Sequence, residues 1–237
     1  MKAFLLSAGL GTRLKPFTDK HPKALAPVNG KPLLEHNIAY LRRFGITEVI
    51  VNVHHFADQI EASLQQNNGF GLKYRISDER EFVLETGGGL MHAAHFFSGE
   101  YFVMMNVDIL TDFELPRLIR LAAERKSLAA LAVMQRNSSR QLLFDDQMQL
   151  CGWKNRVSEE LKLARRSEPL TEFAFSGIHV LHTDIFKHIT RTGKFSIVDA
   201  YLDLAADHTI CGLDHTGDLL LDVGKPESLE KAASLFS

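Results

Sequence analysis

Two glycines and two cations near the start of the chain form a pattern that can bind a phosphate. Gly9 and Gly11 follow a short apolar run. Glycines let the backbone turn sharply and bring its N–H groups close to an anion. Arg13 comes two residues after the second glycine and Lys23 ten residues later, which adds fixed and mobile positive charge. The segment therefore predicts a phosphate-binding loop after a first buried strand, residues 2–6.

Positive charge is concentrated around this loop. Residues 1–31 carry six basic side chains and one acidic side chain, whereas the whole chain of 237 residues has a net charge of −2. A local positive excess on a mildly acidic protein indicates a focused anion site rather than general nucleic-acid binding. A solvated basic face is the alternative interpretation.

The composition predicts the cellular compartment of the protein and the kinds of partner that it lacks. No apolar run reaches the roughly 18 residues that a membrane span needs, and the apolar residues 3–6 are too few for a signal peptide. Cys151 and Cys211 form no metal-ligand spacing, so no disulfide framework is expected. We therefore expect a cytoplasmic protein with neither a membrane nor a nucleic-acid partner.

Two aspartates follow strand-like runs. Asp108 lies two residues past the strand expected over residues 101–106, and Asp222 lies at the end of a late strand in residues 219–224. Ligands of open parallel sheets bind beyond the carboxyl ends of the strands. Mg²⁺ held on substrate phosphates uses one or two carboxylates, so the pair suits a magnesium site. Each aspartate alone would also suit a helix cap or a loop.

Three consecutive glycines, residues 87–89, precede an apolar helix expected over residues 90–97. They remove side-chain obstruction and would leave N–H groups exposed at a helix start. A flat base or a ribose could pack against such a backbone. A flexible hinge is the alternative interpretation.

Other motifs that bind nucleotides or cleave esters are incomplete. A dinucleotide fingerprint needs a third glycine where Leu14 stands, and no Gly-Lys-Ser/Thr follows for a Walker A loop. Ser176 lacks the Gly-x-Ser-x-Gly context of a hydrolase. The histidines have no carboxylate or cysteine at metal-ligand spacing. A nicotinamide-dependent oxidoreductase and a hydrolase are therefore disfavoured.

The elements that must position these residues alternate along the chain. Strand-like and helical segments in turn predict an α/β fold, a Rossmann-like three-layer mostly parallel sheet with helices on both faces. Residues 141–153 predict a small antiparallel insertion that turns at Asp145-Asp146, and residues 154–170 a polar loop or lid. Strands are expected over residues 2–6, 48–53, 72–77, 101–106, 128–134, 173–181 and 219–224, and helices over 32–45, 57–66, 90–97, 115–125, 184–190, 197–206 and 227–235.

Taken together, these motifs resemble the sugar-phosphate nucleotidyltransferases. The likeness runs through Ala8–Leu14, Pro16, Thr18, Pro22-Lys23, Pro27-Val28, Lys31–Leu33, Glu85–Gly88, Asp108, Ser176-Gly177 and Asp222–Gly224. It spans almost the whole chain. Within the family, the length and residues 84–89 look most like N-acetylmuramate-1-phosphate uridylyltransferases, with mannose-1-phosphate guanylyltransferases close behind.

The resemblance implies substrates, a cofactor and site residues. It implies an NTP and a sugar 1-phosphate as substrates, Mg²⁺ as cofactor, and one domain over residues 1–237. The nucleotide part would be near 1–135 and the sugar-phosphate part near 136–237. The implied roles are catalysis for Arg13 and Lys23, metal binding for Asp108 and Asp222, nucleotide binding for Ala8, Gly9, Gly11, Thr12, Arg13, Thr86 and Gly87, and sugar-phosphate binding for Lys154, Glu172 and Gly177.

The sequence differs from the family's pattern at one place, and a second class of protein fits the same motifs. Residues 152–155 around Lys154 depart from the family's acidic-Lys-Pro pattern. A non-catalytic sugar-nucleotide sensor of the same fold is the alternative from another class of protein. Retention of both Asp108 and Asp222 disfavours a sensor, because binding without turnover does not need both metal carboxylates.

Overall fold

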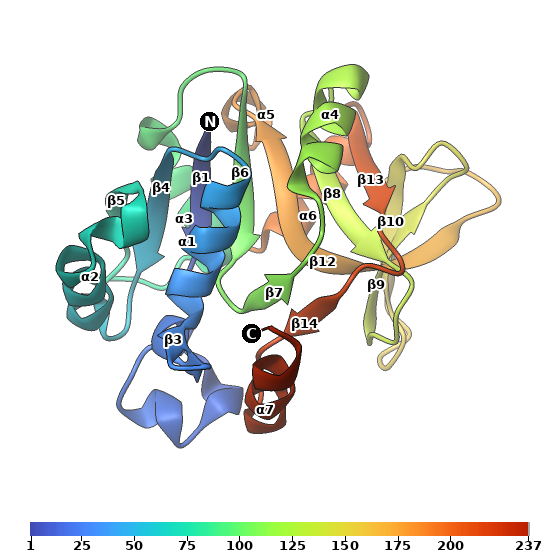
Figure 1. The fold of residues 1–237 in the computed structure, drawn as a ribbon. Coiled ribbons are helices and arrows are strands. Elements are labelled where there is room, and N and C mark those ends of the chain that lie inside the picture. The colour runs from blue at the N-terminus through green and yellow to red at the C-terminus, as the bar shows by residue number, and fades with distance from the viewer. Residues whose placement is uncertain (237) are drawn as a thin grey trace.

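A sheet of ten strands forms the middle of the protein, and four neighbouring strands on one side of it are parallel. The computed structural model describes residues 1–236, and Figure 1 shows helices on both sides of the sheet. The parallel strands lie side by side in the order β5 (Lys73–Asp78), β4 (Glu48–Val53), β1 (Lys2–Leu6) and β6 (Tyr101–Asn106). Because these strands share one direction, their carboxyl ends meet at one edge.

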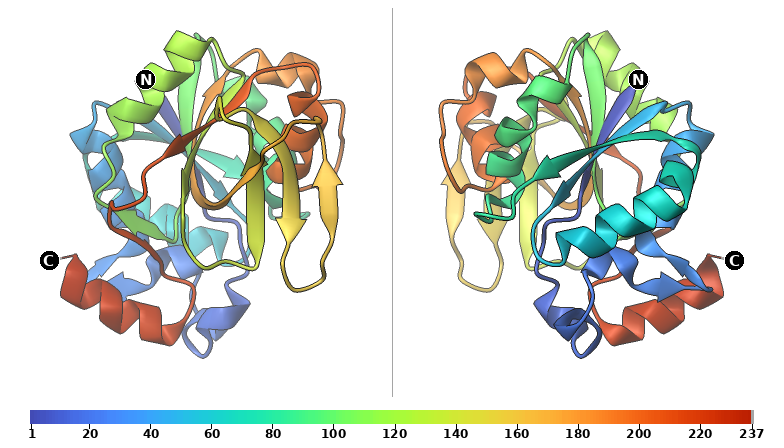
Figure 2. Two further views of the ribbon diagram at one scale, coloured as in Figure 1. Left: turned by 90° about the vertical axis from the view of Figure 1, so that its right-hand side faces the viewer. Right: turned by 90° about the vertical axis from the view of Figure 1, so that its left-hand side faces the viewer.

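The other six strands are arranged around one long antiparallel strand, β12 (Thr171–His182). It pairs with β6, with β8 (Ala129–Met134) and with β9 (Arg140–Phe144), while β13 (Ile210–Asp214) pairs in parallel with β8. Beyond β9 lie β10 (Leu150–Asn155) and β11 (Leu161–Leu163). The hairpin prediction is confirmed, and Figure 2 shows this antiparallel extension standing at one side of the molecule. The segment predicted as a loop contains β11, because Leu161–Leu163 pair with Gly152–Lys154.

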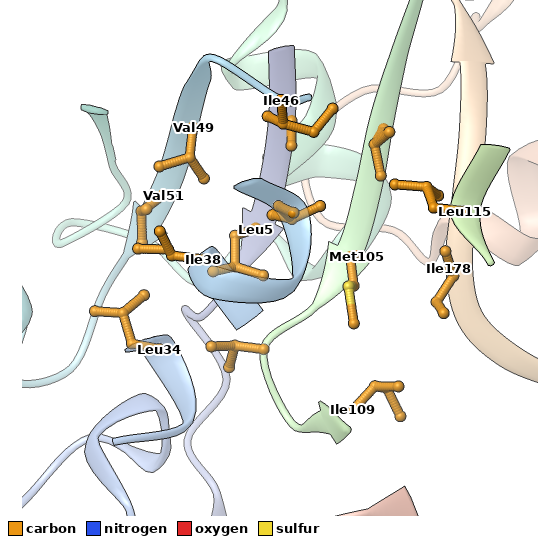
Figure 3. Close-up of a cluster of buried hydrophobic side chains, with 14 of the residues drawn as sticks. Leu5, Leu34, Ile38, Ile46, Val49, Val51, Met105, Ile109, Leu115 and Ile178 are labelled. Carbon is orange, nitrogen blue, oxygen red and sulfur yellow. The ribbon is translucent and has the colours of Figure 1, made fainter. Parts of the chain in front are cut away.

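Helices cover both faces, as the three-layer prediction requires. α1 (Leu33–Arg43), α2 (Ala57–Gln66) and α4 (Leu115–Arg125) cover one face, and α3 (Glu85–His92), α5 (Ile185–His188) and α6 (Ile197–Ala205) cover the other. Successive strand residues point to opposite faces, so Leu5 joins the first cluster and Phe4 the second. Figure 3 shows Leu5 and Val51 facing Ile38 of α1. None of the helices in residues 1–236 is long and apolar enough to cross a membrane.

Helix α3 begins earlier than predicted and contains the three glycines. A Cβ at Gly87 would lie 2.3 Å from the Phe195 ring, and one at Gly88 would lie 2.2 Å from the carbonyl oxygen of Gly193. The N–H of Gly87 donates to the Phe195 carbonyl oxygen at 2.9 Å. The prediction of exposed N–H groups at a helix start was therefore wrong. Gly87 and Gly88 allow close packing of α3 against the segment before α6, and Gly89 makes room for the Glu79 carboxylate.

A two-stranded ribbon outside the main sheet carries Asp222. β7 (Ile109–Thr111) follows Asp108 directly and pairs antiparallel with β14 (Leu220–Asp222). The N–H of Val223 donates to the Asp108 carbonyl oxygen at 2.8 Å. The late strand was predicted correctly, but its placement in the main sheet was wrong. The ribbon brings the two aspartates together, and α7 (Pro226–Leu235) follows it, packed against β2 (Pro27–Val28), which pairs with β3 (Lys31–Pro32).

Burial of His179 on β12 should make the stability of the protein depend on pH. Its Nδ1 lies 2.6 Å from the Tyr201 hydroxyl, and burial lowers the pKa of His179 from 6.5 to about 3. Below pH 6.5 the unfolded chain gains a proton that the folded protein does not. The free energy of unfolding should therefore fall by about 1.4 kcal/mol per pH unit as the pH drops towards 3.

Urea denaturation between pH 6.5 and 5 measures this slope. We expect a steeper loss of stability for the wild type than for His179→Gln, and the wild-type slope for His55→Gln, in which an exposed histidine is replaced. Equal slopes for all three proteins would contradict the assignment.

Candidate active site

A cavity of about 660 Å³ opens along the carboxyl ends of the parallel strands. The sheet order places the ends of β1 and β6 between the β4–β5 side and the antiparallel extension, as Figure 1 shows. The lining residues follow this order. They include Asn52, Glu79 and Thr86 on the β4–β5 side, Gly9, Lys23 and Asp108 in the centre, and Arg140, Trp153, Lys162 and Asp199 at the extension.

The glycine loop directly follows β1. Gly11 has a φ of +63°, and a Cβ there would lie 2.9 Å from the Thr18 methyl and 3.0 Å from the Lys23 Cβ, so only glycine fits. A Cβ at Gly9 would meet no atom within 4 Å, and Gly9 lines the cavity. The N–H groups of Gly9, Leu10 and Gly11 have no hydrogen-bond partner within residues 1–236. Three N–H groups of the loop are therefore free to donate, although of these residues only Gly9 lines the cavity.

Asn52 at the end of β4 fixes the start of this loop. Its Oδ1 accepts hydrogen bonds from the N–H groups of Ser7 at 2.6 Å and Ala8 at 3.2 Å. The predicted backbone donor of Ala8 is thus already used within the protein, although Ala8 lines the cavity. The Asn52 Nδ2 donates to Glu79 Oε1 at 2.8 Å. Burial raises the pKa of Glu79, and the hydrogen bond from Asn52 opposes that shift.

Lys23 and Asp108 form an ion pair in the centre of the cavity. Lys23 begins a short 3-10 helix, η3 (Lys23–Leu25). The side chains are only 10% exposed for Lys23 and 20% for Asp108. Charges so little exposed are stable only when they are paired. The pair therefore ties the segment after the glycine loop to the turn after β6.

Arg13 and Asp222 approach each other around Gly224. A Cβ at Gly224 would lie 2.7 Å from Asp222 Oδ1 and 2.9 Å from Arg13 Nη2. Arg13 lies in η1 (Thr12–Leu14), where Thr12 is exposed. Arg13, Thr12 and Asp222 flank the cavity and are not among its lining residues. The structure thus brings two of the predicted charged groups together beside the Lys23–Asp108 pair.

The surroundings of the Asp222 carboxyl group disfavour its charged form. Its pKa is raised because protein atoms displace water from much of the group, although the residue still reaches solvent, and because Asp108 is close. Lys23, Arg13 and Arg136 act in the opposite direction. Within residues 1–236 no group of three or more His, Cys, Asp or Glu could hold a metal. Two neighbouring carboxylates fit Mg²⁺, whose remaining ligands are phosphate oxygens and water.

Of the two residues predicted to contact the base, Thr86 and Gly87, only Thr86 lines the cavity. Thr86 lines the cavity, and its Oγ1 accepts a hydrogen bond from the N–H of Ile197 at 2.9 Å. This bond ties α3 to the start of α6. Gly87 is buried against Phe195 and is not a lining residue. Its role is packing, as described for α3.

The residues predicted for the sugar phosphate do not line the cavity. Lys154 Nζ lies 3.1 Å from Glu172 Oε1, and an Arg156 nitrogen lies 2.7 Å from Glu172 Oε2. These hydrogen bonds, first from Arg156 and then from Lys154, lower the pKa of Glu172. Lys154 follows Trp153 on β10, and successive strand residues point to opposite faces. The cavity is lined by Trp153, so Lys154 and Glu172 belong to the other face.

Gly177 supports the cavity indirectly. It has a φ of +74°, and a Cβ there would lie 2.8 Å from Asn106 Nδ2. Asn106 lines the cavity at the end of β6. The glycine thus leaves room for a wall residue.

Ser176 and His215 form a buried hydrogen bond of 2.7 Å, with Asp218 3.6 Å from the other ring nitrogen. This order of groups is that of a hydrolase triad. Ser176 is only 1% exposed, however, and is not a lining residue. A substrate in the cavity could not reach it.

Sequence reasoning missed several polar lining residues, among them Asn52, Glu79 and Arg140. Asn52 interrupts an apolar run, and Glu79 comes directly after β5, so the rule that selected Asp108 would also have selected Glu79. Arg140 had no such signal, because nothing in residues 137–143 shows which face of the extension meets the cavity. Arg136 was missed for the same reason.

Replacement of the two loop glycines by alanine should have different effects. Gly11→Ala forces a positive φ on a Cβ that collides with Thr18, and this should destabilise the fold by about 1–3 kcal/mol. Gly9→Ala should leave the melting temperature unchanged, because its Cβ meets only open cavity. Gly9→Ala should instead weaken binding of the expected triphosphate. Thermal unfolding and a binding titration measure both effects, and equal stability losses would contradict this description of the loop.

Known proteins resemble this chain along nearly its whole length. Residues 2–142 match the model of the family described as Nucleotidyl transferase. The chain is 32% identical over 230 residues to the N-acetylmuramate alpha-1-phosphate uridylyltransferase of Caulobacter vibrioides, covering 95% of this chain and 93% of the relative. It is 31% identical over 234 residues to the D-glycero-alpha-D-manno-heptose 1-phosphate guanylyltransferase of Campylobacter jejuni, covering 96% of each.

Solved structures share the fold. HddC from Yersinia pseudotuberculosis superposes with a TM-score of 0.80 at 23% identity, covering 100% of this chain and 99% of that one. At this identity the likeness shows the fold alone. The family match over more than half of the chain, together with two relatives above 30% identity along nearly its whole length, shows that this chain belongs to the nucleotidyl transferase family of enzymes.

Proposed function

We propose that this enzyme transfers a uridylyl group from UTP to N-acetylmuramate 1-phosphate, which yields the nucleotide sugar and pyrophosphate. One observation carries the proposal above all. The Lys23–Asp108 pair, flanked by Arg13 and Asp222, lies where the glycine loop presents free N–H donors. Two relatives that match along nearly the whole chain, from Caulobacter vibrioides and Neisseria meningitidis, are N-acetylmuramate alpha-1-phosphate uridylyltransferases.

The reaction asks for positioning and charge neutralisation. A sugar 1-phosphate oxygen attacks the α-phosphorus of the nucleotide in line, and pyrophosphate leaves. The attacking phosphate is already ionised, so no general base is required. Phosphoryl transfer of this kind depends mainly on positioning and electrostatic stabilisation. Mg²⁺ held by Asp108 and Asp222 would supply further charge neutralisation on the phosphates.

The chain's own cations would perform the rest. The Lys23 ammonium has three donors, so it can hold Asp108 and contact a phosphate oxygen at once. That contact would offset the repulsion between two anions that must approach each other. Arg13 has no ion pair with another described residue, and its planar fork suits the leaving pyrophosphate. Free N–H groups at Gly9–Gly11 would hold the remaining phosphate oxygens.

A guanylyltransferase acting on another sugar 1-phosphate is the second candidate. The Campylobacter jejuni relative, a guanylyltransferase, matches this chain almost as well as the uridylyltransferases do. Pyrophosphate release with UTP and GTP, each tested against N-acetylmuramate, mannose and glucose 1-phosphates, separates the two. Release is expected with UTP and N-acetylmuramate 1-phosphate. Binding without release for every pair would support a sensor instead.

Arg13 and Lys23 should contribute more to catalysis than Lys15 in the same segment. Arg13→Ala and Lys23→Ala should each reduce kcat/KM by about 10²–10³, the loss typical of one oxyanion-stabilising donor. Lys15→Ala is the matched control in the same loop, because Lys15 pairs with Asp19 and both side chains are exposed. Pyrophosphate release at several UTP concentrations measures these effects. Near-normal turnover of either Ala variant at position 13 or 23 would refute its role.

A further inference from the structure

The wall that the antiparallel extension contributes to the cavity is positively charged. Arg140 of β9 and Lys162 of β11 both line it, and Trp153 of β10 lies on the same wall. Trp153 is opposite Lys162 in one strand pair and Leu142 in the other. Residues directly opposite across a strand pair share a face, and so do residues two apart on one strand. Arg140, two residues before Leu142, therefore shares the face of the indole.

The two cations differ in what they contact. Lys162 Nζ lies 3.2 Å from Asp199 and 3.6 Å from Glu160, and 5.2 Å from the centre of the Trp153 ring. The Arg140 guanidinium makes neither an ion pair nor a hydrogen bond with any other of residues 1–236, and the residue is exposed. One unneutralised, planar cation thus faces the cavity at the end away from Asn52 and Glu79.

This cation lies away from the residues that are proposed to hold the reacting phosphates. The glycine loop, Lys23 and Asp108 occupy the centre of the cavity, at the ends of β1 and β6. Arg140 belongs to the extension, which is separated from β6 by β12 in the sheet. A sugar held between centre and extension would have its 1-phosphate at Lys23 and its far substituents at Arg140.

Resting on the proposed function, we propose that Arg140 binds a carboxylate carried by the sugar and so selects acidic sugar 1-phosphates over neutral ones. A guanidinium matches a carboxylate through two parallel hydrogen bonds, which a neutral hydroxyl group cannot reproduce. Trp153 offers an apolar face to the sugar ring beside it. N-acetylmuramate carries a carboxylate on a lactyl ether, and N-acetylglucosamine is the same sugar without that group.

This pair of sugars gives a sharp test. Wild type, Arg140→Gln and Arg140→Lys are assayed for pyrophosphate release with saturating UTP and each of the two 1-phosphates. Arg140→Gln should lose about 10- to 100-fold in kcat/KM on N-acetylmuramate 1-phosphate, the range for one lost charged hydrogen-bonding partner. Its kcat/KM on N-acetylglucosamine 1-phosphate should change less than about threefold. Arg140→Lys should recover part of the loss, because it keeps the charge without the fork.

Two controls keep the result interpretable. Arg166→Gln removes an exposed arginine of the same extension that does not line the cavity, and it should behave as the wild type. UTP binding and the melting temperature of Arg140→Gln should match the wild type, which separates sugar selection from misfolding.

The possible failures are distinct. If Arg140→Gln loses activity equally on both sugars, Arg140 binds the shared phosphate and the inference is wrong while the proposed function stands. No loss on either sugar overturns it as well. If the wild type uses neither acetylated sugar but does use GTP with mannose 1-phosphate, the proposed function is wrong and the inference falls with it.

Discussion

The ion pair between Lys23 and Asp108 is the contact on which the rest of the site depends. It joins the segment after the glycine loop to the turn that leaves β6, and both side chains are largely removed from water. A poorly exposed lysine without its carboxylate, or the reverse, would be an uncompensated charge. The segments around Lys23 and Asp108 must therefore bring the two side chains to the same position. β1 and β6 are neighbours in the sheet and run parallel, so their carboxyl ends supply that place.

Several local features satisfy this constraint. Gly11 has no Cβ, and a Cβ there would strike the Cβ of Lys23 and the methyl of Thr18. The ribbon of β7 and β14 returns the chain to Asp108 and places Asp222 beside it. Asn52 holds the loop at its other end through two backbone N–H groups. The free N–H groups of the loop are thus held between Asn52 of β4 at one end and the Lys23–Asp108 pair at the other.

Much of this arrangement was predictable from the sequence, because it depends on local patterns. The β-branched run at 48–53 and the apolar strand at 101–106 have the bounds of β4 and β6, and the fold class is confirmed. Asp108 was found because it follows such a strand. The three glycines at 87–89 show the limit. Their number indicated free backbone, but Gly87 and Gly88 make room for Phe195 and Gly193, and Gly89 makes room for Glu79; no local pattern connects these residues to the glycines. Asp222 and its strand were predicted, but the pairing of that strand with β7 was not. Arg140 was not predicted, because its face depends on the register of the extension.

We propose that Asp108 acts both as the partner of Lys23 and as a ligand of Mg²⁺. The most direct measurement is the Mg²⁺ dependence of pyrophosphate release by the wild type and by Asp108→Asn, after removal of divalent ions with a chelator. The wild type should lose activity and recover it on addition of Mg²⁺. Asp108→Asn should show little turnover, because a carboxylate ligand is lost. Its half-maximal activity should need a Mg²⁺ concentration at least about tenfold higher than that of the wild type. An Asp108→Asn variant with the wild-type Mg²⁺ dependence and turnover would contradict the account.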